Sequence, residues 1–352
     1  MHSAGGTLLQ HLKEHNLHCG LVEGDRQRGS DRDPSAASYV LREGRLHQPG
    51  QSAADALAQV PGVQVSRGGA GSDLATASIR GASSAQTPIY LAGVRLNDDI
   101  TGTADLSQIP PWMLQRVEVF RGNAPADADR LGIGGAIFFE PLLPRGTKVG
   151  AGLGVGSFGE LAARASGSFG DERAGAMIAL QRQSARNDYR YVDALRPGAL
   201  GAEEQTRRNA DFVAYDLWSL GRLRLGGGSL TAITNAFVRD QGVTGLTLNP
   251  ATAARSHVQR WLGAVTAALP CARAEPDRCR IELSSAAILA DRNIEDPLGE
   301  LGLSSRRVSS RGARVSEQAR LRYRLSDRLA LTGSAAQEFE TLDLALDAAW
   351  AA

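Results

Sequence analysis

The stretch "LQRVEVFRGNAPADADRLGIGGAIFFEP", residues 114–141, decides the fold. Val117, Val119 and Phe120 are β-branched or aromatic and predict a strand that ends at Gly122. A second, very apolar strand, "AIFF", follows a polar loop. Gly134 and Gly135 precede this strand, at a point where a side chain would collide with neighbouring backbone. The stretch therefore predicts two short strands joined by a loop that is held at both ends.

Short elements also surround this stretch. "SAADALAQVPG" predicts a short helix that is capped by Ser52 and stopped by Pro61-Gly62. "ASIRG" and "TPIYLAGVRLND" predict further strands, the second of them a hairpin with Ala92-Gly93 at its tip. We therefore expect residues 48–145 to form a compact α+β unit. Residues 1–47 are charged, small and interrupted by Pro and Gly, which predicts a disordered or loosely ordered lead-in.

Residues 146–352 have a different sequence pattern, with long segments in which apolar and polar residues alternate. In "ARLRYRL", which begins at Ala319, apolar side chains alternate with arginines. Segments of about ten residues with this alternation are typical of strands between lipid and a polar lumen, although a soluble half-buried sheet has the same period. Tight turns alternate with long polar connections, which favours an outer-membrane β-barrel. About nine such strands can be placed.

The bulk composition limits the function classes. The chain has 352 residues, 42% of them apolar, and a formal net charge of +1, so it has no overall field that would attract nucleic acid. No apolar run is long enough for a spanning helix, and the N-terminus lacks the layout of a signal peptide.

Two cysteines flank a turn-rich segment, "PCARAEPDRCR". Cys271 and Cys279 could form a disulfide that pins a hairpin in an oxidising compartment, or they could be two reduced surface thiols. Near the N-terminus a second group has spacings that suit either metal ligands on one helical face or a polar helix turn. This group consists of His11, His15, His18 and Cys19.

Four segments together resemble the plug domain of TonB-dependent outer-membrane receptors. They are "SAADALAQVPGVQVS", "SIRG", "TPIYLAGVRL" and "LQRVEVFRGNAPADADRLGIGGAIFF", in this order and spacing. The resemblance covers about residues 48–145, and the strands that follow resemble the start of the family's barrel. In that family the plug lies inside a twenty-two-stranded barrel, and contact with the inner-membrane TonB complex moves it so that a bound ligand passes into the periplasm.

The resemblance implies a function and its partners. We expect an α+β plug followed by antiparallel transmembrane β-barrel strands, in the outer membrane of a Gram-negative bacterium. The expected partners are a TonB-type energising protein, outer-membrane lipid, and a small ligand such as a siderophore or another nutrient complex. Neither a cofactor nor a catalytic or metal site is expected.

The resemblance also implies roles for individual residues. A latch between plug and barrel would involve Arg80 and Arg121, with Glu118 nearby. A TonB box, which would bind by strand addition, has its candidate in "SYVLRE" at Tyr39, Val40 and Leu41. Structural glycines of the plug would be Gly62, Gly81, Gly93, Gly122, Gly134 and Gly135.

Length departs from the family pattern. Twenty-two strands of about ten residues need roughly 220 residues before any turn, more than the segment from 147 to 352 offers. The expectation is therefore an incomplete barrel, with about nine of twenty-two strands, from a truncated gene product or a partial sequence. Extending the reading frame should recover a signal peptide upstream and about thirteen more strands downstream.

Two rival functions were weighed. Gly154, Gly156 and Gly159 have the G-x-G-x-x-G spacing of a dinucleotide-binding enzyme, but the chain turns back within about ten residues and keeps a period of two. The other rival is a structural or adhesive outer-membrane β-protein without transport, which would leave the plug-like segment as a coincidence.

Overall fold

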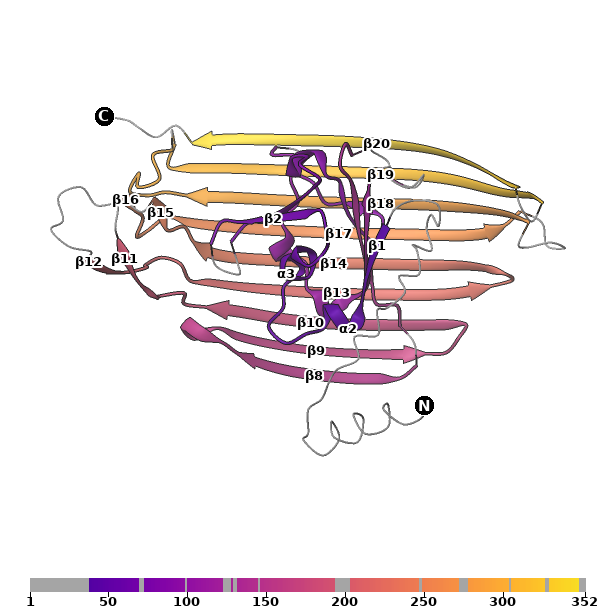
Figure 1. Cartoon of the computed structure of the whole chain (residues 1–352), viewed down its shortest axis with the longest axis horizontal. Coiled ribbons are helices and arrows are strands. Elements are labelled where there is room, and N and C mark those ends of the chain that lie inside the picture. Colours follow the sequence, from indigo (N-terminus) through magenta and orange to yellow (C-terminus); the bar gives the residue numbers. More distant parts are fainter. Residues whose placement is uncertain are drawn as a thin grey trace, which may run out of the picture.

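The computed structural model describes residues 38–347, with gaps at 70–72, 99, 123–127, 129–131, 145, 194–202, 247–248, 272–277, 304 and 327–328. The chain forms a small unit, residues 38–144, and a large antiparallel sheet from Lys148 to Asp347. In Figure 1 the small unit, in indigo and purple, lies across the middle of the large sheet. The proposed metal-ligand group near the N-terminus lies outside the described residues.

A mixed five-stranded sheet organises the small unit. Its order is β1-β6-β7-β4-β5, and the β4–β7 pair is parallel while the other pairs are antiparallel. A separate hairpin pairs β2 with β3. The strands are β1 (Ser38–Arg42), β2 (Val63–Arg67), β3 (Ala75–Ile79), β4 (Ile89–Leu91), β5 (Val94–Arg95), β6 (Leu114–Arg121) and β7 (Gly135–Pro141). The two strands predicted from residues 114–141 are β6 and β7, and they pair with each other.

Helix α3 (Ala53–Ala58) begins where the sequence predicts. The Ser52 hydroxyl accepts from the Asp55 backbone N–H at 3.1 Å, and the Asp55 carboxylate accepts from the Ser52 backbone N–H at 2.9 Å. This reciprocal capping box satisfies two N–H groups at the start of the helix. The predicted hairpin tip at Ala92-Gly93 is also present, and both residues have positive φ.

The small unit begins earlier than the sequence predicts. Strand β1 and the short helix α2 (Glu43–Leu46) precede the expected boundary at residue 48, yet β1 pairs with β6 along its whole length. Leu41 and Leu46 are fully buried in the core of the unit. The prediction of a loose lead-in therefore fails for residues 38–47, because two apolar side chains anchor this segment despite the polar residues around them.

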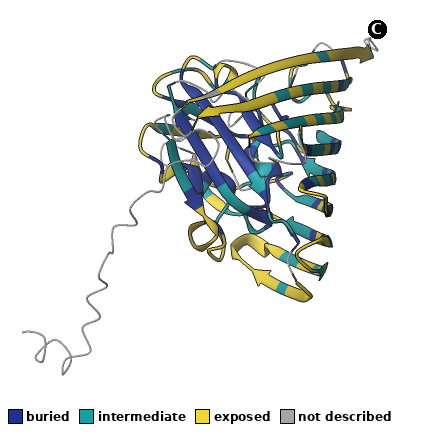
Figure 2. Ribbon diagram, turned by 90° about the vertical axis from the view of Figure 1, so that its right-hand side faces the viewer, coloured by how far each residue is buried: buried dark blue, intermediate teal, exposed yellow. Residues whose placement is uncertain are grey.

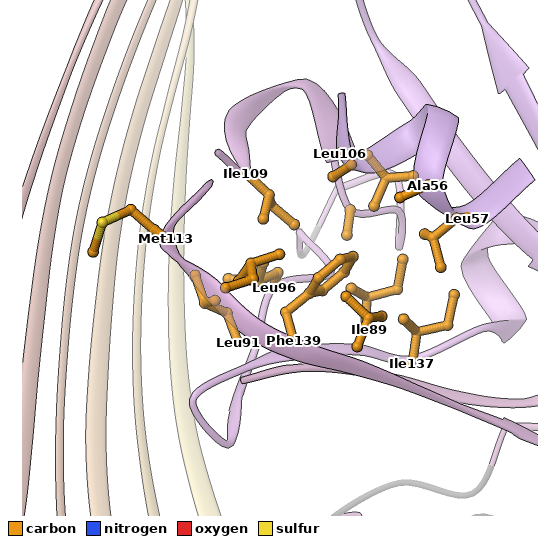
Figure 3. Packing of buried hydrophobic residues seen from close by; sticks show 14 of the residues in the cluster. Ala56, Leu57, Ile89, Leu91, Leu96, Leu106, Ile109, Met113, Ile137 and Phe139 are labelled. Carbon is orange, nitrogen blue, oxygen red and sulfur yellow. The ribbon is translucent and has the colours of Figure 1, made fainter. Parts of the chain in front are cut away.

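One apolar cluster joins the two units. Figure 3 shows Leu57, Ile89, Ile137 and Phe139 gathered inside the small unit, with Met113 pointing toward the strands of the large sheet. The same cluster contains side chains of the large sheet, namely Met177, Ala179, Trp218, Leu220, Ile233, Leu262 and Ala264. The small unit therefore packs on the sheet through a shared core.

The large sheet is an up-and-down meander of nine strands in the order β20-β19-β18-β17-β14-β13-β10-β9-β8. Its strands are β8 (Lys148–Val155), β9 (Leu161–Gly170), β10 (Ala174–Ala185), β13 (Phe212–Leu225), β14 (Gly228–Gly242), β17 (Arg255–Pro270), β18 (Cys279–Glu295), β19 (Arg307–Ser326) and β20 (Leu329–Asp347). Two small hairpins, β11 (Arg190–Asp193) with β12 (Glu203–Thr206) and β15 (Gly245–Leu246) with β16 (Asn249–Pro250), belong to the long connections. The prediction of about nine antiparallel strands is confirmed, and the sheet does not close.

The two faces of the large sheet differ in chemistry. Figure 2 shows exposure alternating along its strands, with the buried small unit on one side. On β19 the side chains of Leu321 and Tyr323 are exposed, while Arg314 faces the small unit and is buried. The face away from the small unit is thus apolar, as the alternation predicts for a lipid-facing surface.

Among the described residues, no helix has the length and apolar character needed to cross a membrane.

Candidate functional site

The contact between the two units is the site of interest. Four arginines on neighbouring strands of the large sheet point toward the small unit, and we call them the arginine ladder: Arg239 on β14, Arg260 on β17, Arg292 on β18 and Arg314 on β19. The strand register puts Arg239 and Arg292 at one level, because Val258 lies opposite both, while Arg260 lies two positions and Arg314 four positions further along the sheet. All four donate hydrogen bonds to one segment of the small unit, residues 95–108.

Arg239 and Arg260 hold the C-terminal end of this segment. Arg239 donates to Ser107 Oγ at 2.7 Å and pairs with Asp105 Oδ2 at 3.1 Å. Arg260 donates to the side-chain and backbone oxygens of Gln108 at 3.0 and 3.3 Å. Both arginines are buried, so these charge-assisted bonds operate in a low-dielectric environment where they are strong.

Arg292 and Arg314 hold the N-terminal end of the segment. Arg292 pairs with Asp98 Oδ2 at 2.9 Å. Arg314 donates to the backbone oxygens of Arg95 and Asn97 at 2.8 and 2.7 Å. These acceptors are backbone carbonyls, which no side-chain substitution removes. The hydrogen bonds of Arg314 to segment 95–108 therefore depend on the path of the main chain.

The pKa of Asp98 reflects this contact. Burial of the carboxyl raises its pKa, but the backbone hydrogen bond from Thr101 and the charge of Arg292 together lower it further than burial raises it. The net result is a pKa below the ordinary value of 3.8, so Asp98 is an anion at neutral pH.

One further ion pair has the opposite polarity. Arg95, on β5 of the small unit, pairs with Glu338 and Glu340 on β20, at 2.6 Å to each carboxylate. Arg314 also contacts Glu340, at 2.9 Å. The small unit therefore offers a cation to β20 and acceptor oxygens to β14, β17, β18 and β19.

Local hydrogen bonds preshape segment 95–108. The Asn97 side chain accepts from the Ile89 backbone N–H at 2.8 Å and donates to the Gly102 oxygen at 2.8 Å. Asp98 accepts from the backbone N–H groups of Ile100 and Thr101, an Asx-type turn. The Asp105 carboxylate accepts from the Ser107 backbone N–H at the start of a short 3-10 helix, Leu106–Gln108. These bonds hold the acceptor oxygens in place before they meet the ladder.

The residues predicted as a latch lie elsewhere. Arg121 donates to the Pro61 oxygen at 3.4 Å, and the side chain of Arg80 lies beside Gly62 and Gly122, all within the small unit. Glu118 is fully buried on β6 and accepts from Arg116 at 2.5 Å. Ion pairs from the small unit to the large sheet are made by Arg95, Asp98 and Asp105, and Asp73 pairs with Arg207 in the connection after β12.

The predicted glycines lie at turns and close approaches. A Cβ on Gly134 would lie 2.3 Å from the Ile79 oxygen, and one on Gly135 would lie 1.9 Å from the Phe120 oxygen. These contacts are too short for any side chain, so β7 can begin beside β3 and β6 only with glycine there. Positive φ values occur at Gly62, Gly81, Gly93, Gly122 and Gly135.

The other predicted site residues are also placed. Tyr39, Val40 and Leu41 lie in β1, at the edge of the small unit's sheet, where they pair with β6. Cys271 and Cys279 form a disulfide with a Cα–Cα separation of 5.2 Å, at the connection between β17 and β18.

A cavity of about 420 Å³ separates the small unit from the large sheet elsewhere in the interface. Its lining includes Arg95 and Arg116 from the small unit and Glu282, Arg320 and Glu338 from the sheet. The two units thus touch firmly at the arginine ladder and leave polar space beside it.

The geometry does not support the rival enzyme. Gly154 lies in β8, and Gly156 and Gly159 lie at the turn between β8 and β9, which run antiparallel. A dinucleotide site needs a helix and then a parallel strand after such a motif. No group of three or more side chains suited to a metal ion occurs within the described residues.

The arginine ladder was missed by sequence reasoning. On each of the four strands, the arginine falls at a position whose side chain points to the polar face of the alternation. Each arginine could therefore have been assigned to the lumenal face. The missing information was the level of each arginine, which depends on the register between strands. Asp98 and Asp105 gave no signal either, because acidic residues are common in loops.

Comparison with known proteins gives two findings. Residues 30–136 match the family described as the TonB-dependent Receptor Plug Domain. The structure is similar to those of a copper transporter, OprC (TM-score 0.65, 16% identity), and of the ferric-catecholate import receptor Fiu from E. coli K12 in its open form (TM-score 0.63, 13% identity). It is also similar to the FrpB iron transporter from Neisseria meningitidis (TM-score 0.70, 12% identity).

The similarities cover most of this chain but a smaller share of each solved structure. Each covers 88% of this chain, but only 47%, 50% and 49% of OprC, Fiu and FrpB respectively. The chain therefore spans about half the length of the solved structures that it matches, and at these identities the likeness establishes the fold.

Proposed function

We propose that this chain, which carries the plug domain of a TonB-dependent receptor followed by strands with the barrel fold of such receptors, takes part in energised uptake across the outer membrane. In this proposal the plug ends near residue 145 and the barrel strands occupy residues 146–352. The observation that carries it is the arginine ladder, because polar contacts beside the shared apolar core can be exchanged while the strands of the large sheet stay paired.

The ligand class follows from the similar structures only in broad terms. One of them is named as a copper transporter, and others as receptors or transporters for iron or ferric complexes. We accordingly propose a small nutrient complex, such as a siderophore or another metal complex, as the ligand.

Strand β1 is the proposed contact for a TonB-type protein. Among the described residues it lies at the edge of the plug sheet, the position at which strand addition takes place. Since Leu41 is fully buried, full engagement of β1 would require this strand to leave the core. Binding of the partner and loosening of the plug would then be one event.

Uptake by cells tests the proposal. Cells that express the protein should accumulate radiolabelled iron supplied as ferric siderophores, or labelled copper, and should lose this accumulation when the inner-membrane proton gradient is dissipated. The matched control is a strain that lacks the TonB-type protein. An outer-membrane protein that supports no energised uptake of any such probe would instead favour the structural or adhesive alternative.

A further inference from the structure

Segment 95–108 presents acceptor oxygens to each of the four arginines of the ladder. Those oxygens belong to two carboxylates, a hydroxyl, an amide and backbone carbonyls. An anion with several oxygens offers the same chemistry to a guanidinium group. In its hydrogen bonding, the segment thus resembles a ligand already in place.

The large sheet beneath segment 95–108 has a basic part and an acidic part. Three arginines on β14, β17 and β18 form what we call the three-arginine patch: Arg239, Arg260 and Arg292. The acidic side chains that face the ladder from the wall include Asp216, which shares Asn235 with Arg260, and the pair Glu338 and Glu340 beside Arg314. Removal of the segment would take carboxylates from Arg239 and Arg292, and would take the cation Arg95 from the acidic pair.

An exposed patch of this kind requires new partners. Buried guanidinium groups are costly when their acceptors leave, so water or an oxygen-rich anion must replace the segment. A cavity of about 50 Å³ already lies between the segment and the wall, lined in part by Asp98, Asp105, Arg260 and Arg292. Cover and patch are therefore not in complete contact even in the closed arrangement.

We propose that the three-arginine patch is part of the ligand's path through the lumen, that segment 95–108 is its removable cover, and that the ligand is an anion with several acceptor oxygens. The inference rests on the proposed function and specifies it. With a neutral ligand, water alone would have to replace the acceptor oxygens of the segment when the cover withdraws.

Ion selectivity across a lipid bilayer tests this path without knowledge of the ligand. Because the nine strands do not close, the chain is first joined to the remaining barrel strands of a similar receptor. The closed barrel is reconstituted in planar bilayers, the plug is loosened with mild urea, and the reversal potential is measured across a KCl gradient. The double variant Arg239→Gln/Arg292→Gln should shift the reversal potential toward the potassium value. The double variant Asp98→Asn/Asp105→Asn breaks the same ion pairs by changing the segment instead of the patch. It should keep the reversal potential at the unmodified protein's value or shift it toward the chloride value.

The direction in which each double variant shifts the reversal potential shows whether the patch lines the path or only holds the plug. If both double variants shift the reversal potential in the same direction, or if the arginine variant shifts it no more than Arg311→Gln, the patch does not line the path and the inference is overturned. Arg311 is a matched control, because it lies on β19 close to Arg314 but its side chain is 77% exposed and pairs with Asp291. Proteolysis and heat-modifiable migration check that each variant is folded.

This experiment is independent of the proposed function. It uses neither a TonB-type protein nor uptake, so a null result in a receptor that imports iron would remove only the inference about the path. Conversely, absence of energised uptake in cells would remove the proposed function whatever the bilayer shows.

Discussion

At the scale of single residues, two glycines determine how closely β7 can approach its neighbours. Gly135 has a φ of +129° and lies against the Phe120 oxygen. Gly135→Ala should destabilise the plug by more than about 2 kcal/mol, because it adds a collision to an unfavourable φ. The measurement is the urea concentration at which a protease begins to cleave the plug.

A second glycine provides the control. Gly81 has a φ of +80°, but a Cβ there would meet nothing within 4 Å. Gly81→Ala should therefore cost only the backbone strain, about 1–2 kcal/mol. Equal losses in the two variants would show that the contact with Phe120 does not matter.

Asp98 should make attachment of the plug sensitive to acid. Its pKa is lowered in the folded protein, so its ionised form stabilises the contact above the ordinary value of 3.8. That contribution should be lost as the pH falls below this value and through the lower folded pKa. Proteolysis of the plug at pH 3 and pH 6 measures the effect, and Asp98→Asn should show a smaller difference between the two.

At the scale of elements, the proposed role of β1 would link plug stability to partner binding. Leu41→Ala should cost about 2–5 kcal/mol, as expected for a large-to-small change in a core. A loosened β1 should then bind a purified TonB-type protein more tightly in a pull-down. Val65→Ala, on β2 and only partly buried, is the comparison variant. Weaker or unchanged binding by Leu41→Ala would place the partner's contact elsewhere.

The disulfide between β17 and β18 reports the compartment. Cys271 and Cys279 are bonded, so they should resist maleimide labelling in intact cells until a reductant is added. Closing so short a loop contributes about 2–3 kcal/mol. Immediate labelling of both thiols in a Cys19→Ser background would argue against an oxidising location.

Most elements could be predicted from the sequence, because their signals are local. Helix α3 follows from the Ser52 cap and the Pro61-Gly62 stop, and β6 and β7 follow from glycine and β-branched residues. The strands of the large sheet follow from alternation. Strand β1 was missed because its buried Leu41 lies near charged residues, and only pairing with β6 makes it a strand.

The interface could not be predicted in the same way. The predicted latch, Arg80, Arg121 and Glu118, rested on motifs of the plug alone. Which plug side chains meet the wall depends on how the plug docks, and the arginine ladder depends on a register between strands that alternation does not reveal. Local pattern therefore predicted the two units but not their contacts.

At the scale of the whole molecule, the outward face of the sheet should tolerate charge poorly. Leu283 points outward on β18 and is 47% exposed, whereas its neighbour Ser284 faces inward. In a bilayer Leu283→Arg should cost about 2–4 kcal/mol if it lies near the midplane, and Ser284→Arg should cost less. Unfolding in lipid vesicles measures both, and equal losses would contradict a lipid-facing surface.

The apolar cluster that spans both units has a consequence for biogenesis. Met177, Trp218, Ile233 and Leu262 complete a core that begins with residues made much earlier on the ribosome. We expect neither part to reach its final stability without the other, so a late step of maturation should bring the N-terminal unit and the sheet together.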